Sequence, residues 1–149
     1  MNIGLVGLGS WARDAYIPLL AEMTEISVEA VAARTEATRQ FAKKTFGSGL
    51  AVFADYKDLL KVETIDALLI ALPNSQHAEV LEVAAASNKH IFFEPPVATD
   101  NETAERILDA LAKSGCGIQA DLELRYLPVM DAVSVKLQSG VLGKPLMAK

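Results

Sequence analysis

A glycine-rich segment near the N-terminus carries the clearest chemical signal in the sequence. The apolar run Ile3 to Val6 leads directly into Gly7-x-Gly9-x-x-Ala12, and a segment with helical periodicity follows. Gly7 permits a tight turn, Gly9 lets the backbone approach phosphates closely, and Ala12 is small enough for the helix to pack against the strand. The start of such a helix offers unpaired N–H groups and a partial positive charge to an anion. The spacing indicates a dinucleotide pyrophosphate site, the alternative being an ordinary strand-to-helix turn.

A second group of polar residues follows the next expected strand. An enzyme that uses NAD usually has Asp or Glu there to accept a hydrogen bond from the ribose 2′-hydroxyl, whereas an arginine suits the 2′-phosphate of NADP. The strand here ends in Ala-Ala-Arg34-Thr35, without an acid, and Arg39 follows one helical turn later. The Arg34 guanidinium can pair with a phosphate and the Thr35 hydroxyl can donate to it. We therefore expect NADP(H) to be favoured over NAD(H), the alternative being that both arginines are solvated surface residues.

The elements that position these residues follow from the alternation of apolar and helical segments. Continuous apolar runs are typical of strands covered on both faces, as in parallel sheets, and connections of this length between them are right-handed. This predicts an α/β fold, a doubly wound parallel sheet of the Rossmann type in a three-layer αβα arrangement with strand order 3-2-1-4-5-6. The expected strands cover residues 3–6, 26–33, 51–53, 67–72, 90–93 and 117–120. The expected helices cover residues 12–23, 36–46, 56–61, 76–87, 100–113 and 125–138.

Local signals mark where these helices begin and break. Pro18 lies inside the first helical segment, where its missing N–H should kink the helix or restart it. Glu102 stands three residues after a threonine, which is the spacing of a capping box. The expected N-cap residues are Thr35, Asp55, Ser75 and Thr99.

The last part of the chain departs from the alternating pattern. Four apolar residues of the helix expected over 125–138 recur at helical spacing and are expected to face a core or an interface: Leu127, Met130, Val133 and Leu137. A turn-rich connector follows, and Leu146-Met147-Ala148 is expected to open another strand.

Composition and charge exclude several classes of function. The 149 residues are 51% hydrophobic and 22% charged, as in a globular protein, and are enough for one domain. The net charge is −5 without a basic run, which argues against a nucleic acid or an anionic membrane as partner.

No apolar stretch approaches the roughly 20 residues that span a bilayer, and the N-terminus lacks the features of a signal peptide. With one cysteine, Cys116, no internal disulfide can form, so a cytoplasmic location is expected.

Several of these segments together resemble the Gfo/Idh/MocA family of NAD(P)-dependent oxidoreductases. Each motif is weak alone, but their order and spacing are specific. The motifs are Gly7-Leu-Gly9-Ser10-Trp11-Ala12, Asp66-Ala-Leu-Leu-Ile-Ala71, Leu72-Pro73-Asn74-x-x-His77, the run from Asn88 to Ala98 with Glu94-Pro95-Pro96, Arg125-Tyr-x-Pro128 and Ser139-Gly140-x-x-Gly143-Lys-Pro145. The resemblance implies hydride transfer to or from a sugar, a polyol or a related alcohol or carbonyl compound. The residues expected to bind the cofactor are Gly7, Gly9, Ser10, Trp11, Ala12, Arg34, Thr35, Arg39, Leu72, Pro73, Asn74, His77, Glu94 and Pro95.

The resemblance also implies a domain organisation. Members of the family join a Rossmann domain to a C-terminal domain that supplies most substrate contacts and usually the oligomer interface. We expect residues 1–122 to form the NAD(P)-binding domain, and residues 123–149 to form a linker helix and the start of the C-terminal domain. The second domain is then essentially absent from this sequence. A small-molecule substrate and a homo-oligomer are expected through that domain.

One departure from the family pattern bears on catalysis. The family's Glu-Lys-Pro signature here reads Glu94-Pro95-Pro96, and Pro95 lacks the cation that reaches toward the nicotinamide and the substrate oxygen in active members. The catalytic residue is therefore unassigned, and the 149-residue chain alone is expected to be inactive. Either another group supplies the acid or base, or the protein binds NADP(H) without turnover as a sensor or assembly protein. A methyltransferase-like domain that binds S-adenosylmethionine fits less well, because it leaves the motifs at Pro73 and Glu94 unexplained.

Overall fold

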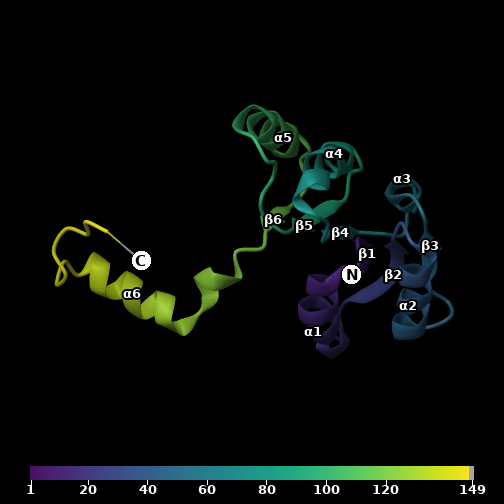
Figure 1. Ribbon diagram of the computed structural model, residues 1–149, viewed down its shortest axis with the longest axis horizontal. Coiled ribbons are helices and arrows are strands. Elements are labelled where there is room, and N and C mark those ends of the chain that lie inside the picture. Colours follow the sequence, from purple (N-terminus) through teal and green to yellow (C-terminus); the bar gives the residue numbers. More distant parts are fainter. Residues whose placement is uncertain (148–149) are drawn as a thin grey trace.

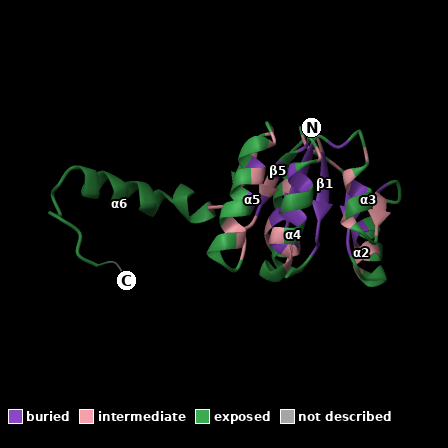
Figure 2. Cartoon of the chain, turned by 90° about the horizontal axis from the view of Figure 1, so that it is seen from above, coloured by how far each residue is buried: buried purple, intermediate pink, exposed green. Residues whose placement is uncertain are grey.

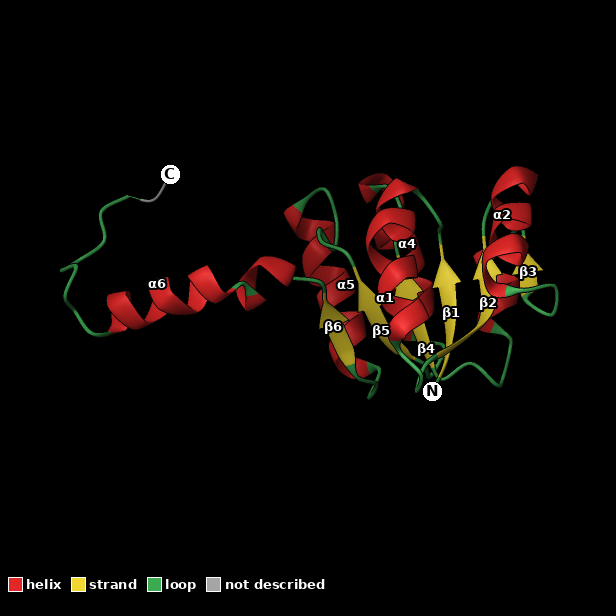
Figure 3. Cartoon of the chain, turned by 90° about the horizontal axis from the view of Figure 1, so that it is seen from below, coloured by secondary structure: helices red, strands yellow, loops and turns green. Residues whose placement is uncertain are grey.

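The computed structural model describes residues 1–147, which form a six-stranded parallel sheet with helices on both faces (Figures 1 and 3). The strand order is β3-β2-β1-β4-β5-β6, so the predicted fold class and strand order are confirmed. The strands are β1 (Asn2–Val6), β2 (Ser27–Ala32), β3 (Ala51–Phe53), β4 (Ala67–Ile70), β5 (His90–Phe93) and β6 (Ile118–Ala120). The helices are η1 (Ala12–Tyr16), α1 (Ile17–Glu22), α2 (Glu36–Phe46), α3 (Tyr56–Leu60), α4 (Asn74–Ala85), α5 (Asn101–Lys113), η2 (Glu123–Tyr126) and α6 (Pro128–Gln138).

Each central strand contributes side chains to two separate hydrophobic cores. In β4, Leu68 and Ile70 pack into the core covered by α3, α4 and α5, whereas Leu69 packs into the core covered by η1, α1 and α2. All four residues of β4 are buried. Successive strand residues point to opposite faces, so a strand covered on both sides needs apolar residues at every position. This is why the strands appear in the sequence as continuous apolar runs.

Two of the expected N-caps are confirmed and two are wrong. The side chains of Thr35 and Asp55 accept hydrogen bonds from the backbone of the first turns of α2 and α3. At α5 the cap is Asp100, whose carboxylate accepts from Thr103 N at 2.8 Å, and not Thr99. An aspartate adjacent to a threonine caps equally well, and the sequence does not separate the two. Helix α4 begins at Asn74, two residues before its expected start, so Ser75 lies inside it.

The first helix, which was expected to kink or restart at Pro18, instead runs on with a change of winding just before it. The five residues Ala12–Tyr16 are wound as a π-helix, and α1 follows with Pro18 in its first turn. Proline is tolerated in that position because the N–H groups of a first turn have no partner within the helix. The preceding π-helix nevertheless supplies acceptors here, since Ile17 N donates to Ala12 O.

The segment after β6 differs from its prediction. The single helix expected over 125–138 is interrupted at Leu127, which is extended (φ −70°, ψ 133°) because it precedes Pro128. Helix α6 extends away from the sheet and is exposed along its length (Figures 1 and 2). The stripe Leu127, Met130, Val133 and Leu137, expected to face a core or an interface, is 40–44% exposed and belongs to neither core. Leu146 and Met147 form no strand, and Ala148 lies outside the described residues.

No helix among residues 1–147 is both long enough and apolar enough to cross a membrane.

Leu59 of α3 offers a direct test of the core. Its side chain is fully buried, and a Cβ added to Gly4 of β1 would lie 2.7 Å from Leu59 Cδ2. Leu59→Ala should lower the free energy of unfolding by about 2–5 kcal/mol, because the cavity has little means of collapsing. Leu19→Ala, at a side chain that is 55% exposed, is the matched control and should cost less than about 1 kcal/mol. Urea unfolding measures both, and equal losses would contradict this description of the core.

Candidate functional site

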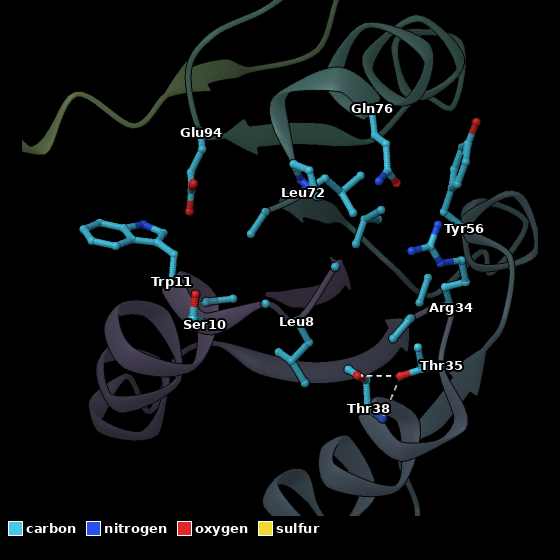
Figure 4. A pocket seen from close by; sticks show the side chains of 18 of the residues that line it. Leu8, Ser10, Trp11, Arg34, Thr35, Thr38, Tyr56, Leu72, Gln76 and Glu94 are labelled. Atoms are coloured by element: carbon cyan, nitrogen blue, oxygen red, sulfur yellow. Dashed lines mark hydrogen bonds between the residues drawn. The ribbon is translucent and has the colours of Figure 1, made fainter.

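A hollow of about 620 Å³ lies at the carboxyl ends of the strands. It is lined by the segments that directly follow β1, β2, β3, β4 and β5 (Figure 4). The chain crosses from β1 to one face of the sheet and from β4 to the other, so neighbouring loops diverge here and leave a crevice. Open α/β sheets bind ligands at such a switch point.

The two glycines of the first turn have different environments. Gly7 has a φ of +90°, its N–H donates to Ala32 O at 2.9 Å, and a Cβ there would lie 2.2 Å from Ala71 O. At Gly9 no atom lies within 4 Å of the corresponding position, so its missing side chain leaves space open in the hollow. Gly7 is therefore required by the fold, whereas Gly9 keeps space for a ligand.

The helix that follows this turn faces the hollow with its first residues. Its first hydrogen bond runs from Arg13 N to Gly9 O at 3.1 Å, which leaves the N–H groups of Ser10, Trp11 and Ala12 without helical partners. Ser10 and Trp11 are exposed along the hollow, while the side chain of Ala12 is buried in the core. The turn thus presents backbone donors where the sequence predicts a pyrophosphate.

At the end of β2, Arg34 and Thr35 line the hollow and Arg39 does not. The Arg34 side chain is exposed at this end of the hollow (Figure 4). The Arg39 guanidinium donates instead to Ala33 O at 2.7 Å and Arg34 O at 2.8 Å, and it pairs with the Glu36 carboxylate, whose pKa it lowers by hydrogen bonding. Arg39 therefore holds the turn that carries Arg34.

Sequence reasoning missed Thr38, which also lines this end of the hollow. Thr35 Oγ1 accepts from Thr38 N at 3.2 Å and donates to Thr38 Oγ1 at 2.8 Å, so its proton is already engaged (Figure 4). The Thr38 hydroxyl retains its own proton for a ligand. The signal that would have found it is the three-residue spacing from the helix cap.

Tyr56 was also missed, although it follows the third strand at the same edge of the sheet. It lines the hollow, and its hydroxyl donates to Glu79 Oε1 at 3.0 Å. Burial, assisted by the Glu79 carboxylate, raises the pKa of Tyr56 to about 12. Its ring is therefore a neutral, partly apolar surface next to Arg34 (Figure 4).

After β4, the residues Leu72 and Pro73 line the hollow, whereas Asn74 and His77 do not. His77 is 1% exposed and lies behind the wall. Its Nδ1 is 2.7 Å from Pro96 O and its Nε2 is 2.7 Å from Leu72 O. Both partners are backbone carbonyl oxygens of segments that line or adjoin the hollow. His77 thus ties the segment after β4 to the segment after β5.

At the far end, Glu94 points into the hollow beside Trp11, whereas Pro95 does not line it (Figure 4). Among the described residues Glu94 Oε1 is buried without a hydrogen-bond partner. Burial raises the pKa of the Glu94 carboxyl, the Tyr16 hydroxyl opposes this shift, and the Asp121 carboxylate adds to it. The Pro95–Pro96 peptide bond is cis.

Tyr16 and Asp121 lie close to Glu94 at this end of the hollow, and neither was predicted from the sequence. The Tyr16 hydroxyl donates to Asp121 Oδ2 at 2.5 Å, and burial followed by this bond raises the pKa of Tyr16 far above its ordinary value. Asp121 N donates to Phe93 O at 2.8 Å, which holds Asp121 next to Glu94 at adjacent strand ends. No sequence signal joins residues that lie 105 positions apart.

The hollow as a whole fits a dinucleotide. It has Arg34 and Asp55 after the neighbouring strands β2 and β3 at one end, a middle section with open space at Gly9 and free backbone donors, and an acidic end at Glu94. The orphaned Glu94 Oε1 marks the acidic end as a place for a ligand group. No cluster of three or more His, Cys, Asp or Glu residues suited to a metal ion occurs within the described part of the chain.

Comparison with known proteins agrees with this geometry. A 3-ketoreductase from Actinomadura kijaniata, solved in complex with NADP and TDP-benzene, has a TM-score of 0.83 and 26% identity over 95% of this chain and 43% of its own. A scyllo-inositol dehydrogenase from Lactobacillus casei, solved with NAD(H) and scyllo-inositol, has a TM-score of 0.86 and 26% identity over 97% of this chain and 42% of its own.

Sequence relatives give the same result. The inositol 2-dehydrogenase/D-chiro-inositol 3-dehydrogenase of Lacticaseibacillus casei is 31% identical over the whole of this chain and 43% of its own length. This chain therefore spans less than half the length of that relative. The family model described as "Oxidoreductase family, NAD-binding Rossmann fold" matches residues 1–122. The chain belongs to this family, the Gfo/Idh/MocA oxidoreductases, as its motifs predict.

Proposed function

We propose that this chain is the NADP(H)-binding part of an oxidoreductase that transfers a hydride to or from a sugar, a polyol or a related small alcohol or carbonyl compound. The observation that carries the proposal is the continuous hollow at the switch point, with Arg34 at one end and Glu94 at the other. The dehydrogenase and the ketoreductase described above act on small molecules of this kind. When bound, the nicotinamide accepts or gives the hydride.

The direction of the cofactor follows from the residues at the two ends. An arginine at the end of β2, where no acid is present, is suited to the 2′-phosphate on the adenosine side. Ser10, Trp11 and Ala12 supply backbone donors for the pyrophosphate. The nicotinamide half then extends over β4 toward Leu72, Pro73 and Glu94.

The proposed division of labour assigns residues 1–122 to the cofactor. Residues 123–149 connect this part to a C-terminal domain that binds the substrate and forms any homo-oligomer contact. The reading as a non-catalytic sensor rests on Pro95 alone, and no relative described here favours it. Because the substrate contacts are assigned to the other domain, the chain of 149 residues should bind the cofactor without turning over an alcohol.

Arg34 tests the preference for NADP(H). Arg34→Ala removes a charge-assisted contact to phosphate worth about 1.5–3 kcal/mol, so affinity for NADP(H) should fall about ten- to a hundredfold while affinity for NAD(H) changes little. Arg106→Ala, at an exposed residue of α5 that pairs with Glu82 away from the hollow, is the control and should change neither. Calorimetric titration gives all the affinities. Equal binding of both cofactors that is indifferent to Arg34→Ala would contradict the preference.

The two glycines test the site separately from the fold. Gly9→Ala places a methyl group in open space and should leave the free energy of unfolding within about 1 kcal/mol of the original, while weakening NADP(H) and NAD(H) alike by about tenfold or more. Gly7→Ala forces a side chain against Ala71 O at a φ of +90°, so the fold itself should lose about 3 kcal/mol or more. Urea unfolding and calorimetry separate the two effects. Unchanged cofactor affinity in Gly9→Ala would show that no phosphate approaches this turn.

A further inference from the structure

The acidic end of the hollow contains a group that the fold leaves unsatisfied. Glu94 points into the hollow beside Trp11, and its Oε1 is buried without a partner among residues 1–147 (Figure 4). Leaving a buried polar atom without a hydrogen bond costs free energy. Arg34 is the one cationic side chain among the described lining residues, and it lies at the other end. Glu94 Oε1 is therefore available to a ligand and has no lysine or arginine beside it in the hollow.

The groups that face Glu94 come from four elements. Tyr16 of η1 and His77 of α4 act to lower its pKa, while Asp121 after β6 and Glu123 of η2 act to raise it. Burial is the largest influence and favours the protonated carboxyl. The Tyr16 proton is engaged with Asp121 at 2.5 Å, and both ring nitrogens of His77 are engaged with backbone carbonyls. Glu94 is thus the member of this cluster that faces the hollow with a free polar atom.

We propose that Glu94 Oε1 takes up and returns the proton of the redox reaction, and that its protonation state follows the charge of the nicotinamide ring beside it. The inference rests on the proposed function. When an alcohol is oxidised, its C–H bond breaks and both electrons leave with the hydride. The O–H electron pair forms the carbonyl, and the proton passes to the Glu94 carboxylate. In the reverse direction the Glu94 carboxyl gives the proton to the oxygen of the carbonyl compound.

The charge of the nicotinamide ring couples the redox state of the cofactor to the protonation of Glu94. The oxidised nicotinamide ring is positively charged and the reduced ring is neutral. An opposite charge within about 4–6 Å lowers a carboxyl pKa by about 1–3. The oxidised ring therefore favours the ionised form of Glu94, which accepts a proton, and the reduced ring favours the protonated form, which donates one, more than the oxidised ring does. Each redox state shifts Glu94 toward the form that its own reaction needs.

Calorimetry in paired buffers of different ionisation enthalpy tests the coupling on the chain itself. Binding of NADP+ should release more protons than binding of NADPH from mildly acidic to neutral pH. The 2′-phosphate contributes equally to both ligands and cancels in this difference. By linkage, the ratio of NADP+ to NADPH affinity should rise with pH by about tenfold or more in total.

Two variants decide the assignment. Glu94→Gln keeps the shape of the side chain but cannot ionise, so the difference in proton release and the pH dependence of the affinity ratio should both disappear. Glu105→Gln, at an exposed residue of α5 outside the hollow, should keep both. Equal proton release for NADP+ and NADPH in the original chain, or a difference that survives Glu94→Gln, overturns the inference alone. Failure of the original chain to bind either nucleotide overturns the proposed function as well.

A measurement without any cofactor tests whether folding raises the pKa of the Glu94 carboxyl. Because its pKa is raised in the folded chain above the ordinary 4.5, its contribution to stability is complete at acid pH and is lost as pH rises through the folded pKa. Glu94→Gln does not undergo this loss, so its stability relative to the original chain in urea unfolding should increase from acid toward neutral pH. A difference that is constant with pH would show that the carboxyl is not held in its neutral form.

Discussion

The close approach of Gly7 to the carbonyl of Ala71 is the constraint on which the rest of the site depends. It brings the end of β1 against the end of β4, where the chain crosses to opposite faces of the sheet. Any side chain at Gly7 would collide with that carbonyl, and its φ of +90° belongs to glycine. With this contact formed, the first helix must begin at the edge of the crevice with its free N–H groups facing inward. The contact therefore fixes where these backbone donors lie in the hollow.

Around this fixed centre the two ends of the hollow carry different charged groups. At one end Arg39 holds the turn after β2 so that Arg34 remains free and exposed. At the other end Tyr16, Asp121 and Glu94 form an acidic cluster in which the pKa of Glu94 is raised. A dinucleotide with a phosphate at one end and a ring of changing charge at the other matches this arrangement. His77 contributes from behind the wall by joining the segments that follow β4 and β5.

Much of the fold could be predicted because it is encoded locally. Apolar runs covered on both faces, helical segments between them and the glycine turn are each visible within a few residues, and together they define the sheet order. Where two residues close in sequence could play the same role, the sequence did not decide which of them does. Asp100 caps α5 in place of Thr99, and Arg34 lines the hollow while Arg39 does not. In both cases neighbouring residues have the same chemical capacity, and backbone geometry decides between them.

The parts that escaped prediction depend on contacts between distant segments. Tyr16 and Asp121 meet only because η1 packs beside the ends of β5 and β6. Pro128 divides the expected last helix, and its apolar stripe remains uncovered in the described residues. Helical periodicity indicates that a face is apolar but does not identify what packs against it.

A crystal structure of the chain with NADP+ tests the central claim most directly. We expect the 2′-phosphate against Arg34 and Thr38, the pyrophosphate over Gly9, and the nicotinamide ring within contact distance of Glu94 and Trp11. A cofactor bound in the reverse direction, or bound outside the hollow, would contradict it.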